Sequence, residues 1–233
     1  MKKHVLFISL LCLSSFGGAQ GLKSIVYDTE VAPNPNSFQP LPLPEPNTTG
    51  QTYLHEEWSV GDLTVQSGVI KQLPLRFDVY NNQIEINTEE GIKVCPIELV
   101  KTVKYTTPVF EEVILVNSSQ IVANSSFQRN KLLKVEYLGE YSLLKGFSTR
   151  IIEASYRPEF GAGSRTHRIV INEQYYLQNE NRIIPLEKSF EDSEELRKEE
   201  QDLIKNYKKQ NKIRSKNQES LIELIEFLNN KGA

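Results

Sequence analysis

The 233-residue sequence has little of the chemistry that most catalytic and metal sites require. It contains only two cysteines and three histidines. A structural zinc site takes four Cys or His ligands, usually in closely spaced pairs, and no such pairs are present. A catalytic thiol needs a histidine and a third orienting group, and no motif surrounds any of the histidines. We therefore expect no metal and no cofactor, and the sequence identifies no catalytic residues.

A strong positive field is also missing. Lys and Arg number 27 against 30 Asp and Glu, which gives a formal charge of −3 and a pI near 5.8. A protein that binds the nucleic-acid backbone needs concentrated positive charge, so we expect no nucleic acid as a partner. The one glycine-rich loop, residues 161–164, precedes a strand pattern at residues 168–171. Phosphate loops lead into a helix, so this segment is typical of a hairpin loop.

No apolar run in the sequence is long enough to span a bilayer. The longest one, at residues 5–13, follows Lys2 and Lys3 and precedes Gly17-Gly18-Ala19. A basic start, a short apolar middle and small residues at the end are typical of a signal peptide. We predict a signal peptide over residues 1–19, export to the periplasm or the extracellular space, and no membrane span after cleavage.

Removal of residues 1–19 changes the charge and the cysteine count. Lys2 and Lys3 are lost without any acid, which leaves 25 basic and 30 acidic residues and a formal charge of −5. Cys12 is lost as well, so Cys95 remains alone and an intrachain disulfide is excluded. Because Cys95 lies among apolar residues, we predict that it is a small buried hydrophobe.

The rest of the sequence divides into three regions. Residues 20–51 hold six of the eleven prolines, all between Pro33 and Pro46, and this composition predicts a proline-rich arm or linker. Residues 52–187 show the period of two that is typical of strands. Residues 188–233 change to a helical period and form a tail. These are the predicted domain boundaries.

The strand-like region contains three predicted hairpins. Residues 75–80 and 83–87 flank Asn81-Asn82, a pair that tolerates positive φ in turns. Residues 132–138 and 141–145 form the second hairpin, and residues 175–177 and 183–184 form the third. Because no helical patterns intervene, we predict a mainly β fold with an antiparallel meander. The pattern leaves open whether the sheet is curved and open or barrel-like.

The tail predicts two helices with a break near residues 211–215. Ser215 stands three residues before Gln218, which fits a capping box at the start of the second helix. The apolar stripe of that helix is a possible partner surface, made of Leu221, Leu224, Ile225 and Leu228.

Charge is segregated along the tail, with seven acids in residues 191–202 and no acid in residues 205–216. Acids at the start and bases at the end of a helix suit its dipole, and this explains most of the pattern. A basic patch for an anionic partner is the alternative interpretation. It would consist of Lys205, Lys208, Lys209, Lys212, Arg214 and Lys216.

Several short segments occur in an order that resembles uncharacterised exported proteins of Bacteroidetes. They are Trp58-Ser59-Val60-Gly61, residues 75–78, 139–145, 175–177 and 204–212, and the ending at residues 221–229. These proteins have a W-x-x-G start, a β-rich middle and a two-helix tail that ends in an aromatic–Asn motif. In this chain Leu228 separates Phe227 from Asn229. The resemblance implies an envelope location and an accessory role, and it carries no catalytic residues.

Three functional hypotheses follow from the sequence. The first is a non-enzymatic exported cell-envelope protein that binds a protein partner. The second is a periplasmic carrier that encloses a lipid or another apolar ligand in a curved sheet. The third is a hydrolase with an unrecognised site. The sequence favours the first, because the residues present suggest no catalytic set.

Overall fold

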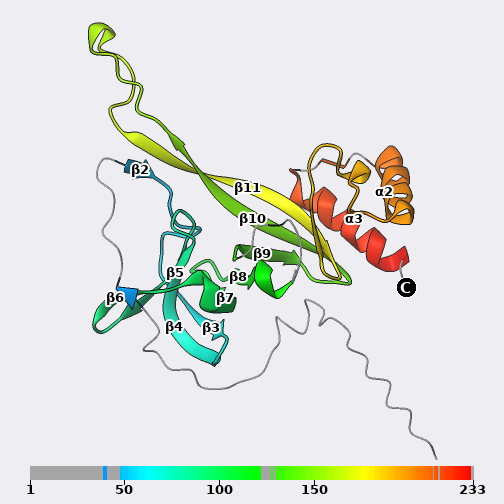
Figure 1. Cartoon of the computed structure of the whole chain (residues 1–233), viewed down its shortest axis with the longest axis horizontal. Coiled ribbons are helices and arrows are strands. Elements are labelled where there is room, and N and C mark those ends of the chain that lie inside the picture. The colour runs from blue at the N-terminus through cyan, green and yellow to red at the C-terminus, as the bar shows by residue number, and fades with distance from the viewer. Residues whose placement is uncertain are drawn as a thin grey trace, which may run out of the picture.

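The computed structural model describes residues 39–40, 48–121, 127, 130–211, 213–214 and 216–231 (Figure 1). The predicted signal peptide and most of the proline-rich arm lie outside these residues. No helix among the described residues has both the length and the apolar character needed to cross a membrane.

The described strands form one sheet whose order is β1-β6-β5-β4-β3-β7-β8-β9-β10-β11-β12, with β2 paired to β11. The strands are β1 Gln39–Pro40, β2 Thr48–Gly50, β3 Ser59–Val65, β4 Gly68–Asp78, β5 Gln83–Thr88, β6 Gly91–Cys95, β7 Val100–Thr106, β8 Glu112–Asn117, β9 Leu132–Tyr137, β10 Tyr141–Ile152, β11 His167–Asn179 and β12 Arg182–Pro185. The mainly β prediction is confirmed. The sheet is open and does not close into a barrel, and β2–β11 is a parallel exception to the antiparallel pairing.

All three predicted hairpins are present. In β4–β5, Leu75 pairs with Ile86 and Asp78 with Gln83, and Asn82 in the turn has a φ of 51°. The other two are β9–β10 and β11–β12. Turn chemistry and alternation therefore predict these local pairings correctly.

The apolar side chains form three buried clusters. The first core lies among β3–β8, extends to Leu132 of β9 and Phe147 of β10, and includes Leu63, Phe77 and Tyr105. The second core lies between β10–β12 and the tail. The third core, around Leu133 and Leu144, occupies the opposite face of β9 and β10. One sheet therefore supports packing on both of its faces.

The tail folds into α2, Lys198–Gln210, and α3, Gln218–Lys231. Helix α3 packs against β10. Short 3-10 turns occur at Ile97–Leu99, Ser118–Gln120, Pro158–Phe160 and Phe190–Asp192. The predicted break between the two helices is confirmed, and it extends to residue 217.

The start of α3 differs from the predicted capping box. Ser215 lies outside the described residues, and the cap is Asn217, whose side-chain oxygen accepts the backbone N–H of Ser220 at 2.7 Å. The Asn217 carbonyl accepts the Leu221 N–H at 3.1 Å. Asn is as effective an N-cap as Ser, so Asn217 can satisfy the first turn of α3 two residues after the predicted cap.

The possible partner surface on α3 is covered by the chain itself. Leu221, Leu224, Ile225 and Leu228 are buried in the second core. They share that core with Tyr141 and Leu143 of β10 and with Leu177 of β11. The stripe correctly predicted that this helix face is buried, but its partner is the chain's own sheet and not a second protein.

Candidate functional site

Strands β10 and β11 form a long two-stranded arm that projects from the rest of the sheet. Their pairing runs without interruption from Tyr141↔Asn179 to Ile152↔Arg168. Strand β9 pairs with β10 only as far as Gly146. Figure 1 shows the distal half of the ribbon extending away from the body, at the end opposite the helices. We define the distal arm as residues 147–170.

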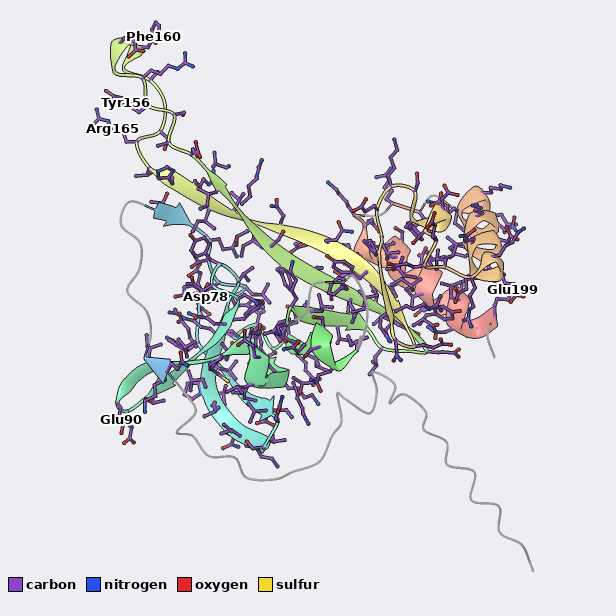
Figure 2. The ribbon with its side chains drawn as sticks, in the orientation of Figure 1. Asp78, Glu90, Tyr156, Phe160, Arg165 and Glu199 are labelled. Atoms are coloured by element: carbon purple, nitrogen blue, oxygen red, sulfur yellow. The ribbon has the colours of Figure 1, made fainter. Side chains whose placement is uncertain are left out.

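The end of the distal arm presents apolar side chains to solvent. The exposed fraction is 45% for Ile151, 43% for Ile152 and 73% for Phe160. The Arg165 guanidinium donates to the Tyr156 hydroxyl at 3.0 Å and lies 4.4 Å from the centre of its ring. Figure 2 shows Tyr156, Phe160 and Arg165 at the far end of the ribbon. The glycine-rich segment 161–164 lies in this connection, so the predicted hairpin loop is confirmed.

A second exposed apolar turn joins β7 to β8. The exposed fraction is 80% for Val109 and 90% for Phe110. Phe110 has a φ of 64°, a left-handed conformation that is uncommon for a bulky residue. Its N–H donates to the Thr107 carbonyl at 2.9 Å, and the Thr107 N–H donates to the Glu111 carbonyl at 2.9 Å. The turn is therefore held by its own backbone.

A buried carboxylate fastens the tail to the sheet. Glu200, in the first turn of α2, accepts hydrogen bonds from the Tyr141 hydroxyl at 2.8 Å and from both terminal nitrogens of Arg182 at 2.9 Å. It also accepts the backbone N–H of Arg197 at 2.7 Å. Burial raises the pKa of Glu200, but the hydrogen bonds from Arg182 and Arg197 outweigh it and hold this pKa well below its usual range. The carboxylate is saturated by structural partners and is a poor acid–base catalyst.

The side chain of Lys145 lies between the first core and the second core. Leu143, Lys145 and Phe147 share one face of β10, and Lys145 stands between the two apolar clusters. Its ammonium lies 3.0 Å from a Glu136 oxygen and donates to the Gln218 side chain at 3.3 Å. Burial lowers the pKa of Lys145, but Glu136 outweighs it and raises this pKa overall. Lys145 therefore stays protonated, which does not suit a nucleophile.

Trp58, at the start of the W-x-x-G segment, has a structural role. The Arg76 guanidinium lies 3.7 Å from the centre of the Tyr53 ring and 4.3 Å from that of Trp58. The same group bonds the buried Glu85 through two nitrogens, at 2.9 and 2.8 Å. Stacking on the two rings and the paired hydrogen bonds together hold the Arg76 side chain in one orientation.

The six residues of the basic patch are not one unpaired cluster. Lys205 pairs with Asp192 at 2.9 Å and Lys208 pairs with Glu191. Lys209, Arg214 and Lys216 are exposed, and Lys212 lies outside the described residues. Acids of the segment before α2 thus neutralise part of the charge, which weakens the field that an anionic partner would meet.

Two side chains of the types used as base and nucleophile, His55 and Cys95, are engaged or buried. His55 Nδ1 lies 3.0 Å from the Tyr105 hydroxyl, and burial lowers the pKa of His55. Cys95 is fully buried, as predicted, and burial raises its pKa to about 12. Within the described ranges, no three His, Cys, Asp or Glu residues gather as a metal site.

Sequence reasoning missed the length of the arm and the fastening role of Glu200. The alternation of residues 147–152 could have extended β10, but nothing local distinguishes Glu200 from the acids around it.

No protein-family model, no curated protein and no solved structure matches this chain. The resemblance to exported Bacteroidetes proteins therefore stays a prediction.

Proposed function

We propose that this chain is a non-enzymatic exported cell-envelope protein that binds a protein partner through the distal arm. The observation that carries the proposal is the exposure of Ile151, Ile152 and Phe160 on a ribbon that stands apart from the body. Exposed apolar side chains gathered on one projecting element are typical of interaction sites.

The build of the arm supports this function. An isolated two-stranded ribbon is marginally stable in water. From Phe147 onward β10 has only β11 as a strand neighbour among the described residues, and the short β2 adds a third strand to the arm only at residues 167–169. A ribbon of this length that exposes isoleucines gains stability when a second surface covers it. Export rests on the signal-peptide pattern of residues 1–19, which the described residues do not include.

The described residues give less support to the carrier of an apolar ligand and to the hydrolase. A groove of about 530 Å³ lies beside β11, but most of the side chains that line it are polar or charged, including Asn172, Glu173, Lys188 and Lys216. Such a lining does not suit an apolar ligand. Among the residues that the structure describes, we find no arrangement of nucleophile and base that favours the hydrolase.

Site-specific photo-crosslinking in the producing cell tests the proposal. A photoreactive residue at Phe160 is expected to give a discrete protein adduct in the envelope fraction, and the double variant I151T/I152T is expected to abolish it. The matched control carries the same group at Phe110, which is even more exposed and lies on another turn. The proposal fails if position 160 gives no adduct, or if position 110 gives the same one.

Two further measurements separate the parts of the proposal. N-terminal sequencing of the secreted or periplasmic protein is expected to begin at Gln20, and recovery of the chain only from the cytoplasm, with residues 1–19 intact, would refute export. The double variant is expected to keep its free energy of unfolding within about 0.5 kcal/mol, because the two isoleucines are half exposed. A larger loss of unfolding free energy would mean that the adduct is missing because the variant unfolds.

A further inference from the structure

The basic side chains of the distal arm are all arginines. The whole chain has nine arginines and eighteen lysines, yet residues 147–170 contain four of the arginines and none of the lysines. The four are Arg150, Arg157, Arg165 and Arg168. A guanidinium gives up its water more easily than an ammonium, so arginine is enriched and lysine is depleted in protein interfaces. The composition of the distal arm is therefore typical of an interface and not of a solvated surface.

Two of these arginines flank an isoleucine on one face of the ribbon. Ile152 pairs directly with Arg168, and Arg150 pairs with Val170. Paired residues share a face of the sheet, and so do residues two apart on one strand, so Arg150, Ile152 and Arg168 lie on the same face. All three are exposed, with 43% of Ile152 open to solvent. This face presents an apolar side chain between two cations.

The two guanidiniums on this face have no carboxylate to bond. Within the residues that the structure describes, neither Arg150 nor Arg168 makes an ion pair. In the body, by contrast, Arg76 and Arg182 each bond a buried carboxylate. Like charges at neighbouring positions of a sheet repel each other, and a carboxylate from outside relieves that repulsion while it bonds both nitrogens of a guanidinium fork.

We propose that the partner of the distal arm is a protein surface that carries Asp or Glu side chains around an apolar pocket. The carboxylates of that surface bond Arg150 and Arg168, and the pocket receives Ile152. A desolvated anchor with charge-assisted hydrogen bonds beside it is the usual centre of a protein interface. The inference rests on the proposed function and adds the chemistry of the partner to it.

The charge of the distal arm favours an acidic protein over the other anionic partners. Four arginines against Glu153 and Glu159 give residues 147–170 a formal charge of +2, although the whole chain carries −3. Nucleic acid requires a denser positive field than this. An anionic membrane attracts lysine as well as arginine, so it does not explain the absence of lysine. Symmetric pairing with the arm of a second copy would bring two positive arms together.

Photo-crosslinking from the same face tests the chemistry of the partner. Ser148 is exposed and lies two residues before Arg150, so a photoreactive residue at position 148 of the full chain is expected to give an envelope-protein adduct in the producing cell. R150Q/R168Q is expected to lower the adduct yield at least about tenfold. R150K/R168K keeps the charge without the fork and is expected to recover only part of the yield. The matched control R214Q removes an exposed arginine of the tail and is expected to leave the yield unchanged.

The fold of the variants and the nature of the adduct are measured in parallel. R150Q/R168Q is expected to keep the urea midpoint of the unmodified chain, because both side chains are exposed. If the double variant unfolds, the single variants R150Q and R168Q replace it, each with an expected loss of yield of at least about threefold. Mass spectrometry is expected to place Asp or Glu in the partner segment that is crosslinked to position 148.

The outcomes separate this inference from the proposed function. An adduct at position 160, with a yield at position 148 that R150Q/R168Q leaves unchanged, would overturn the acidic partner and keep the proposed function. No adduct at either position would overturn both. An adduct between two copies of this chain would assign the face to self-association and overturn the inference. Binding to vesicles of phosphatidylglycerol and phosphatidylethanolamine that R150Q/R168Q abolishes would assign the face to lipid, with the same result.

Discussion

The side-chain amide of Asn229 in α3 bonds the backbone of Tyr141 in β10 as a neighbouring strand would. Asn229 Oδ1 accepts the Tyr141 N–H at 2.9 Å, and Asn229 Nδ2 donates to the Tyr141 carbonyl at 2.9 Å. A Cβ atom at Gly139 would lie 2.7 Å from Asn229 Nδ2, so glycine there makes room for the contact. Asn229 therefore satisfies both backbone hydrogen-bonding groups of Tyr141 at the start of β10.

Replacement of Asn229 by aspartate tests this contact. N229D keeps the shape and the acceptor but sets a carboxylate oxygen against the Tyr141 carbonyl. We expect the free energy of unfolding to fall by about 1–3 kcal/mol, measured by urea denaturation. Asn230 is exposed, so N230D is the matched control and is expected to change stability by less than about 0.5 kcal/mol. Equal effects of the two variants would contradict the contact.

Removal of the Glu200 carboxylate is expected to loosen the whole tail. E200A leaves Arg182, Arg197 and Tyr141 without their shared acceptor. We expect a loss of about 2–4 kcal/mol in unfolding free energy, because Arg182 keeps some exposure to solvent. The control is E199A, since Glu199 is exposed on α2 (Figure 2). A loss in E200A no larger than that in E199A would contradict the fastening role.

The same carboxylate predicts acid sensitivity. The pKa of Glu200 is held below its usual range in the folded chain, because hydrogen bonds from Arg182 and Arg197 outweigh the effect of burial. Its stabilisation is therefore complete above the unfolded-state pKa, about 4.3, and is lost as the pH falls below that toward the folded value. Unfolding free energies measured between pH 7 and pH 2 are expected to fall more steeply for the unmodified chain than for E200Q. Parallel profiles would refute the assignment.

Gly61 is expected to tolerate no side chain. A Cβ atom at this position would lie 2.3 Å from the Lys104 carbonyl oxygen and 2.5 Å from Tyr105 Cβ, so β3 and β7 would have to separate. We expect G61A to lower the free energy of unfolding by about 1–3 kcal/mol in thermal or urea denaturation. The neighbouring Val60 is exposed, and V60A serves as the control. A neutral G61A would show that the two strands approach less closely.

Cys95 is expected to report global unfolding. Its thiol is fully buried, and burial raises its pKa to about 12, so both access and thiolate formation are suppressed. In the mature chain we expect iodoacetamide at pH 8 to label Cys95 only in urea concentrations that unfold the protein. Rapid labelling in native buffer would place the thiol at the surface.

Local sequence determined the elements of this protein. Alternation and the Asn81-Asn82 turn predict the β4–β5 hairpin, because neighbouring residues alone set that register. The helical period predicts α2 and α3, and the apolar surroundings of Cys95 predict its burial. Each of these signals acts within a few residues, so the sequence displays it directly.

Only the tertiary structure decided what each surface meets. The stripe on α3 shows that Leu221 and Leu224 must be buried, but an apolar stripe does not name its partner. Glu200 and Asn229 resemble their polar neighbours in the sequence, and their partner Tyr141 lies 59 and 88 residues away. Strands β2 and β12 likewise pair with different parts of β11, and only the arrangement of the strands in space decides where each pairing stops. Such long-range complementarity depends on how the strands are arranged in space, and no local pattern records it.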